Sequence, residues 1–273
     1  MPELPEVETV CRGLEPALAG KTIERVDMRR KDLRKPFPRN LKKIVDGSKV
    51  THIARRAKYI LIHLNNQYVL VIHLGMSGRI VFYPRAYKPQ THDHFILHLK
   101  NGQQIVFNDP RRFGLVDLVH EDAMESHALF SHLGPEPLGN GFSGPVLADA
   151  IKGKKVAIKN AIMDQCVVVG VGNIYASEAL FMAGIDPKKP AGRVRGEKAD
   201  ALAQAIKKVL RAAVKAGGST LRDHRQTNGE LGYFQHRFAV YGREGHPCPG
   251  CSCGIQRIVQ GGRATFYCAT CQK

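Results

Sequence analysis

The sequence has no long hydrophobic run and comparatively few acidic residues. No apolar stretch approaches the roughly 20 residues that a helix needs to cross a bilayer, and the chain does not open with a basic segment followed by an apolar one. Low-complexity runs are absent as well. With 24 acidic residues against 41 lysines and arginines, the formal net charge is +17. These absences argue against a membrane protein and predict a soluble, cytoplasmic protein.

The basic residues are spread over the whole chain. They cluster at 29–35, 55–58, 152–155 and 193–195. A fold that exposes these clusters presents a broad positive surface, which is typical of proteins that bind nucleic acid. A basic protein without a specific partner, or one that binds acidic lipid, would have a similar composition. The absence of a hydrophobic anchor disfavours the lipid surface.

The sequence has seven cysteines, and four of them follow a metal-binding spacing. Two C-x2-C pairs, separated by sixteen residues, are formed by Cys248, Cys251, Cys268 and Cys271. This spacing is typical of a structural zinc site, because four thiolates complete the tetrahedron and leave no position for an activated water. We therefore expect one structural Zn²⁺. Cys253 stands outside the spacing, and Cys11 and Cys166 are expected to be buried thiols.

Hydrophobic periodicity changes twice along the chain. Residues 5–18 have one apolar face and predict a helix. Residues 22–119 contain short β-branched segments separated by turns, which predict an antiparallel β-sandwich. Helical spacing returns at 197–216. After residue 237 the pattern indicates a hairpin that places Arg263 just after its turn.

These patterns predict an α+β protein with several domains. Residues 1–133 would form an N-terminal antiparallel β-sandwich with flanking helices. A Gly- and Pro-rich linker would follow at 134–150. Residues 151–236 would form a helical domain, and residues 237–273 the zinc-binding hairpin.

The first residues, MPELPEVETV, suggest amine chemistry. Removal of Met1 would leave Pro2 as a secondary amine with a pKa of about 8, which is partly neutral and therefore nucleophilic near neutral pH. A helix that begins near Pro5 would lower this pKa further, because its positive end lies beside the amine. Attack on an aldehyde-level sugar carbon gives an iminium that acidifies the adjacent C–H, and Glu3 could transfer protons there. In isolation, the same residues would simply begin a well-capped helix.

Eight motifs, in order, resemble those of formamidopyrimidine-DNA glycosylases over essentially the whole chain. They are PELPEVET, RRAKY, HLGMSG, HDH, DPRRFG, HLGPEPL, VVGVGNIYASEALF and GGRATFYCATCQK. The resemblance implies a β-sandwich, a helix–two-turn–helix module and a zinc finger. It also implies a monomeric bacterial enzyme of base excision repair at the nucleoid. Such an enzyme removes 8-oxoguanine and formamidopyrimidines from double-stranded DNA and cleaves abasic sites by β,δ-elimination.

The resemblance assigns roles to four candidate catalytic residues. Pro2 would attack C1′ of the deoxyribose as the Schiff-base nucleophile, and Glu3 would donate the proton that helps to open the sugar. Lys58 would donate a proton during β-elimination. Arg263 would bind a phosphate and assist δ-elimination. Without the family, Lys58 would be interpreted as a solvated strand lysine and Arg263 as a charge on a hairpin.

Three further residues match the family's void-filling set. Base excision takes the damaged nucleotide out of the stack, so side chains must fill the space that it leaves. Phe113 would wedge between bases, Met76 would fill the gap flexibly, and Arg111 would hydrogen-bond the partner base. Core positions are the alternative for Met76 and Phe113. Their neighbouring glycines indicate turns, which favours exposed tips.

Several motifs are expected to contact phosphates. GVGN before a helix presents backbone N–H groups, with Asn173 at the helix start. The other matching positions are His92, Arg111, Lys154 and Lys159. We do not expect His92 and His94 to bind metal, because the cysteines already account for the zinc. Residues 222–234 match the family's lesion-capping loop, and their composition leaves the base preference open.

Two other functions remain open. An endonuclease VIII-like enzyme would act on oxidised pyrimidines, but PELPEV and the intact DPRRFG favour the enzyme for purines. A non-catalytic zinc-ribbon protein would only bind damaged DNA. It would not need Pro2, Glu3, Lys58 and Arg263 together.

Overall fold

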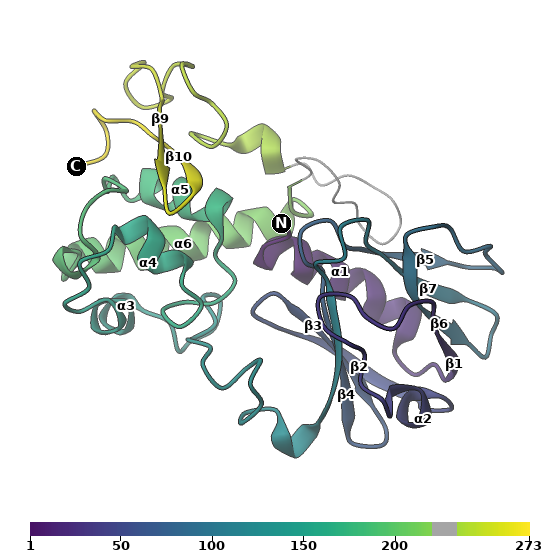
Figure 1. Cartoon of the computed structure of the whole chain (residues 1–273). Helices are drawn as coiled ribbons and strands as arrows, with labels where there is room; N and C mark the ends of the chain where they lie inside the picture. Colours follow the sequence, from purple (N-terminus) through teal and green to yellow (C-terminus); the bar gives the residue numbers. More distant parts are fainter. Residues whose placement is uncertain (220–233) are drawn as a thin grey trace. The chain divides into compact units, whose positions relative to one another are not determined.

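The structure, a computed structural model, describes residues 1–219 and 234–273 (Figure 1). The chain divides into two compact units. The first contains residues 1–131 and the segment that begins at Ala216, and the second contains residues 132–215 and 234–273. Among the described residues, no helix has both the length and the apolar character needed to span a bilayer.

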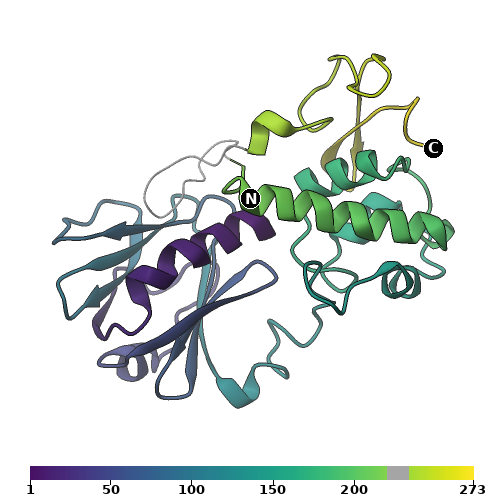
Figure 2. The same ribbon diagram turned by 180° about the vertical axis from the view of Figure 1, so that it is seen from behind.

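The first unit consists of two four-stranded antiparallel sheets and helix α1 (Leu4–Leu18) (Figure 2). One sheet has the order β1 (Ile23–Met28), β6 (Asp93–Leu99), β7 (Gln104–Asn108), β5 (Arg79–Tyr83). The other has the order β2 (Val50–Arg56), β3 (Tyr59–Leu64), β4 (Tyr68–His73), β8 (Leu115–His120). Short helices α2 (Leu41–Val45) and η1 (Glu121–Ala123) complete it. The predicted sandwich and the helix predicted at 5–18 are thus confirmed.

One hydrophobic core joins the helix to both sheets. Helix α1 packs against β2, β3 and β5, and its apolar face contributes Val7, Val10 and Leu14. Alternate residues of the strands, such as Ile60 and Phe107, face the same core. The apolar faces of the helix and of the strands therefore share one core. This shared core fixes the position of the start of α1 relative to the ends of the strands.

The second unit holds the remaining helices and one hairpin. Its elements are α3 (Gly144–Ala150), α4 (Ile158–Met163), α5 (Asn173–Met182), η2 (Ala191–Arg193), α6 (Glu197–Lys215), η3 (Phe234–Arg237), β9 (Gln256–Gln260) and β10 (Arg263–Tyr267). Helix α5 packs against α6 on one side and β10 on the other. Strands β9 and β10 form the predicted hairpin, with Arg263 directly after its turn.

The structure differs from the predicted boundaries at two places. Residues 144–150 of the predicted linker form helix α3, because Ser143 caps it, Pro145 suits its first turn, and α6 covers it. Residues 216–219 belong to the first unit, although the prediction placed them in the helical domain. Here Ser219 donates hydrogen bonds from its backbone N–H and from its hydroxyl to Glu6 Oε1, at 2.8 and 3.0 Å.

Candidate active site and metal centre

Pro2 and Glu3 are buried directly before helix α1. The backbone N–H of Glu3 donates a 2.8 Å hydrogen bond to Oε2 of Glu6, and the Glu3 side chain accepts one from the Glu6 backbone. This reciprocal capping box fixes the first turn, whose positive dipole end lies at Pro2. Met1 precedes Pro2 and is exposed, so the Pro2 nitrogen belongs to a peptide bond until Met1 is removed.

Lys58 is buried in the tight turn between β2 and β3. Ala57 adopts a φ of +54°, and its carbonyl accepts a 2.9 Å hydrogen bond from Arg55 Nη1. Arg55 Nε also donates to Glu8 Oε2 at 2.9 Å, which ties the turn to α1. Burial alone would raise the pKa of Glu8, but hydrogen bonds from Arg55 and Arg12 lower it. The carboxylate is therefore ionised and keeps the strand that precedes Lys58 in place.

His73, at the end of β4, is a candidate site residue that the sequence analysis missed. Its Nδ1 accepts a 2.9 Å hydrogen bond from the backbone N–H of Gly75, and its ring packs against Tyr59. Burial, together with the positive charges of Lys58 and Arg34, lowers its pKa to about 4. The ring is therefore neutral near pH 7, and because Nδ1 accepts, the proton lies on Nε2 and can be donated. His73 lies in the motif HLGMSG, in which only Met76 was predicted to have a role.

The predicted void-filling residues lie on two exposed loops of the first unit. Met76 is 43% and Phe113 45% exposed, which confirms the prediction of exposed tips. Arg111 is also exposed, and its guanidinium carbon lies 4.9 Å from the centre of the Phe113 ring. The loops approach so closely that a Cβ on Gly75, at a φ of +64°, would lie 2.4 Å from the Phe113 backbone. Only glycine fits there.

The buried carboxylate of Asp109 joins these two loops. Asp109 accepts hydrogen bonds from Ser77 Oγ at 2.6 Å and from the Gly114 backbone at 2.7 Å. The backbone N–H of Arg111 donates to Ser77 Oγ at 3.1 Å. His94 is bound to the Asp109 carbonyl through Nε2, whereas His92 is exposed. His92 is thus available to a ligand, and His94 is a structural residue.

Lys159 was predicted to contact DNA, and the structure places its side chain in a fully buried position. Its ammonium donates to Thr265 Oγ1 at 2.7 Å, to the Ala264 carbonyl at 3.0 Å and to Asn173 Oδ1. A buried ammonium needs such partners. Lys159 therefore positions Asn173 and strand β10 instead of standing on the surface.

Asn173 begins α5, as predicted, and its amide is fixed from two sides. Nδ2 donates to the Ala264 carbonyl at 3.0 Å and lies 3.4 Å from the Tyr241 hydroxyl. Arg263 and Lys154 are both exposed. Arg263, at the start of the adjoining β10, thus presents a cation suited to an anion. The predicted site residues are divided between the units: Pro2, Glu3 and Lys58 belong to the first, and Arg263 to the second.

The four predicted cysteines form one cluster. The sulfur atoms of Cys248, Cys251, Cys268 and Cys271 all lie within 4.8 Å of one another. The Cys248–Cys271 and Cys251–Cys268 sulfur distances are 3.8 and 3.4 Å. A tetrahedron with Zn–S bonds of about 2.3 Å has edges of about 3.8 Å, so the donor set fits that ion. Across the described residues this is the sole cluster of metal-binding type, and Cys253 is not in it.

The remaining cysteines give one confirmation and one correction. Cys11 is buried, and burial raises the pKa of its thiol to about 12. Cys166 was predicted to be buried but is exposed. The buried side chains at this place belong to Val167, Val168 and Val169, which follow it.

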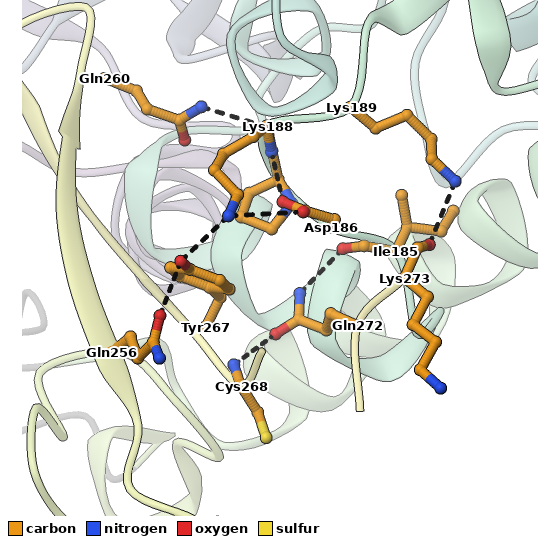
Figure 3. Close-up of polar contacts among 11 residues, drawn as sticks. Ile185, Asp186, Lys188, Lys189, Gln256, Gln260, Tyr267, Cys268, Gln272 and Lys273 are labelled. Carbon is orange, nitrogen blue, oxygen red and sulfur yellow. Dashed lines mark hydrogen bonds and ion pairs between the residues drawn. The ribbon is translucent and has the colours of Figure 1, made fainter. Parts of the chain in front are cut away.

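The end of the chain fastens the cysteine hairpin to the helical part of the second unit (Figure 3). Gln272 Oε1 accepts from the Cys268 backbone and Gln272 Nε2 donates to the Ile185 carbonyl, each at 2.9 Å. Lys188 Nζ donates to the Tyr267 hydroxyl at 3.1 Å. These contacts hold β10, and with it Arg263, against the loop after α5.

Comparison with known proteins identifies the family. Residues 1–116 match the formamidopyrimidine-DNA glycosylase N-terminal domain, and residues 133–225 match its H2TH domain. The formamidopyrimidine-DNA glycosylases of Azorhizobium caulinodans and Cereibacter sphaeroides are each 51% identical to this chain, over 100% of both sequences.

Solved structures agree with this relationship over nearly the full length. The MutM (Fpg) protein of Thermus thermophilus has a TM-score of 0.89 at 41% identity and covers 99% of this chain and 98% of its own. A variant of Lactococcus lactis Fpg bound to Fapy-dG-containing DNA has a TM-score of 0.92 at 32% identity over 100% of both chains. The L. lactis protein bound to abasic DNA has a TM-score of 0.91 at 32% identity over 99% of both. The chain described here belongs to the formamidopyrimidine-DNA glycosylase family.

Proposed function

We propose that this chain excises oxidised purines from double-stranded DNA and then cleaves the strand at the abasic site by β,δ-elimination. The observation that carries the proposal is the buried, capped N-terminus: Pro2 stands at the positive end of α1, with Glu3 beside it. The L. lactis relatives bound to Fapy-dG and to abasic DNA support the same substrates.

The proposed reaction begins once Met1 is removed. The neutral Pro2 amine attacks C1′, the C1′–base bond breaks, and Glu3 protonates the ring oxygen as the sugar opens. The iminium withdraws electrons, so a proton leaves C2′ and the 3′ phosphate departs with the C3′–O electron pair. Lys58, buried in the turn after β2, donates protons in this step. Arg263 binds a phosphate and assists the second elimination.

The cysteine cluster is proposed to hold one structural zinc ion. Bound zinc would fix the β9–β10 hairpin and thereby the exposed Arg263 at its turn. Four thiolates leave no open coordination position, so the ion supplies structure only.

Trapping of the covalent intermediate tests the nucleophile. Borohydride should reduce the iminium on a duplex that contains 8-oxoguanine, and the adduct should map to the N-terminal peptide. Pro2→Gly keeps an amine and should trap less. A protein with an uncleaved N-terminal extension has no free amine and should not trap at all. Undiminished strand cleavage by that extended protein would overturn the mechanism.

The range of damaged bases that the protein removes needs a separate measurement. One solved L. lactis Fpg complex contains an oxidised pyrimidine, so single-turnover excision of 8-oxoguanine should be compared with that of an oxidised pyrimidine in the same duplex. We expect 8-oxoguanine to be removed faster. Faster removal of the pyrimidine would favour the endonuclease VIII-like alternative. The predicted lesion-capping loop lies outside the described residues, except for Phe234, so this comparison relies on kinetics.

A further inference from the structure

Helix α6 has one buried face and one face that borders a groove. The buried face includes Leu202, Ile206 and Val209. The groove, of about 520 Å³, lies between the other face and the carboxyl end of α5. The residues that line it include Met182, Ala201, Ala205, Lys207, Lys208 and Arg211. In Figure 2, α6 runs across the front of the second unit.

The floor of the groove is apolar and adaptable. Met182 is 47% exposed, an unusual position for a large apolar side chain. Ala201 and Ala205 face it and leave space because they lack longer side chains. A methionine beside small residues can accommodate an inserted apolar side chain of variable shape. The floor is therefore suited to one apolar anchor.

The rim of the groove is cationic. Lys207, Lys208 and Arg211 line it, and no acidic residue does so within the described chain. Among the described residues, no carboxylate forms an ion pair with these three cations. Lys207 Nζ has one long contact, 3.5 Å, to the Gly139 carbonyl. The rim is thus complementary to negative charge.

The position and the floor favour an acidic protein segment over DNA. The groove lies at Met182, whereas Asn173 stands at the other end of α5, roughly 14 Å away at 1.5 Å per residue. Helix α5 also separates α6 from β10, the strand that begins with Arg263. A sugar-phosphate backbone has no apolar side chain for Met182, whereas protein interfaces commonly combine methionine and arginine with a buried anchor.

We propose that this groove docks an acidic segment of a partner protein. The segment inserts one apolar side chain between Met182 and Ala205 and places carboxylates against Lys207, Lys208 and Arg211. Within the second unit the groove is separate from Asn173 and Arg263, so docking recruits the protein without occupying these two groups.

Fluorescence anisotropy with the full, zinc-loaded chain tests the proposal. The probe is a fluorescein-labelled peptide of aspartate and glutamate around one central phenylalanine, and the matched peptide has alanine at that place. We expect the phenylalanine peptide to bind at least about tenfold more tightly. Met182→Ser should weaken only the phenylalanine peptide, because it removes the apolar contact and leaves the charges.

Charge variants separate the groove from the general positive surface. Lys208→Glu with Arg211→Glu should weaken the phenylalanine peptide at least about tenfold. Lys42→Glu with Lys43→Glu changes the net charge equally on the exposed face of α2 and should leave peptide binding unchanged. Both pairs should excise 8-oxoguanine normally, which shows that they fold.

Three outcomes would overturn the docking site. The first is no saturable binding of the phenylalanine peptide, and the second is equal weakening by the two charge-variant pairs. The third is displacement of the peptide by undamaged duplex together with an equal loss of duplex affinity in the groove variants. That last result would assign the groove to the DNA surface instead.

Discussion

The hydroxyl of Ser77 donates a 2.6 Å hydrogen bond to Oδ1 of Asp109. This bond links the loop that carries Met76 to the loop that carries Arg111 and Phe113. Asp109 is fully buried, and its other oxygen accepts from the Gly114 backbone. The exposed side chains that would fill the gap in DNA are therefore held by one buried group beneath them.

Ser77→Ala should loosen both loops while leaving the proposed nucleophile unchanged. The substitution removes the hydrogen bond from the Ser77 hydroxyl to Asp109 Oδ1 and the one from the Arg111 backbone N–H to Ser77 Oγ. The free energy of unfolding should fall by about 1–3 kcal/mol, because both partners stay without a hydrogen bond. Excision of 8-oxoguanine from duplex should slow about tenfold or more. Cleavage at a preformed abasic site is the control and should slow less. Equal slowing of both reactions would show that the bond supports the fold generally.

Arg111→Ala should flatten the preference for cytosine over adenine opposite the lesion. The guanidinium offers donors only, and cytosine presents O2 and N3 acceptors on the edge that flipping frees. The loss against cytosine should be on the order of 1–3 kcal/mol, as for a good base contact. Single-turnover excision opposite each of the four bases measures the ratio. Phe113→Ala is the companion variant: it should slow excision in all four contexts and leave the ratio intact. An unchanged ratio in Arg111→Ala would refute the assignment.

His73 should make the stability of the fold depend on pH below 6.5. Burial and two nearby cations lower its folded pKa to about 4, below the unfolded value of about 6.5. The unfolded state therefore binds more protons between these values, and stability falls as the pH drops from 6.5 to 4. The loss should be on the order of 3 kcal/mol. Urea unfolding at pH 7 and pH 5 should show a smaller difference in His73→Gln than in the parent. Identical pH dependence in both proteins would contradict the neutral, buried ring.

Removal of metal should affect the two units differently. Chelation or Cys268→Ala should disorder the β9–β10 hairpin and displace Arg263, and affinity for lesion duplex should fall. Hydrogen exchange should remain slow in the β-sandwich, which has its own core. Cys253→Ala is the matched control, because this cysteine lies outside the cluster. Full duplex affinity in the metal-free protein would exclude a scaffold role.

Local signals in the sequence predicted much of this molecule. Periodicity located α1 and the sandwich, because both bury one apolar face in a shared core. The cysteine spacing located the cluster of four cysteines, since each C-x2-C turn brings two sulfurs together. Glycines beside Met76 and Phe113 indicated exposed loops for a geometric reason, namely the close approach at Gly75.

What failed depended on contacts between distant residues. The burial of Lys159 was not apparent from the sequence, because its partners include Thr265 and Ala264 of a distant strand. Helix α3 was hidden in a Gly- and Pro-rich stretch because its stability comes from packing on α6. The importance of His73 arises from its neighbours Lys58 and Tyr59 in space, which no spacing along HLGMSG reveals.

The carboxylate of Glu6 has a consequence for how the enzyme is made. One of its oxygens holds the Glu3 backbone, and the other holds Ser219, 213 residues further along the chain. During synthesis the N-terminal residues emerge from the ribosome first, yet their anchor is completed only after Ser219 has been translated. A chain that stops before Ser219 therefore has Pro2, the proposed nucleophile, without the contact between Ser219 and Glu6. Translation through Ser219 is needed to complete this contact.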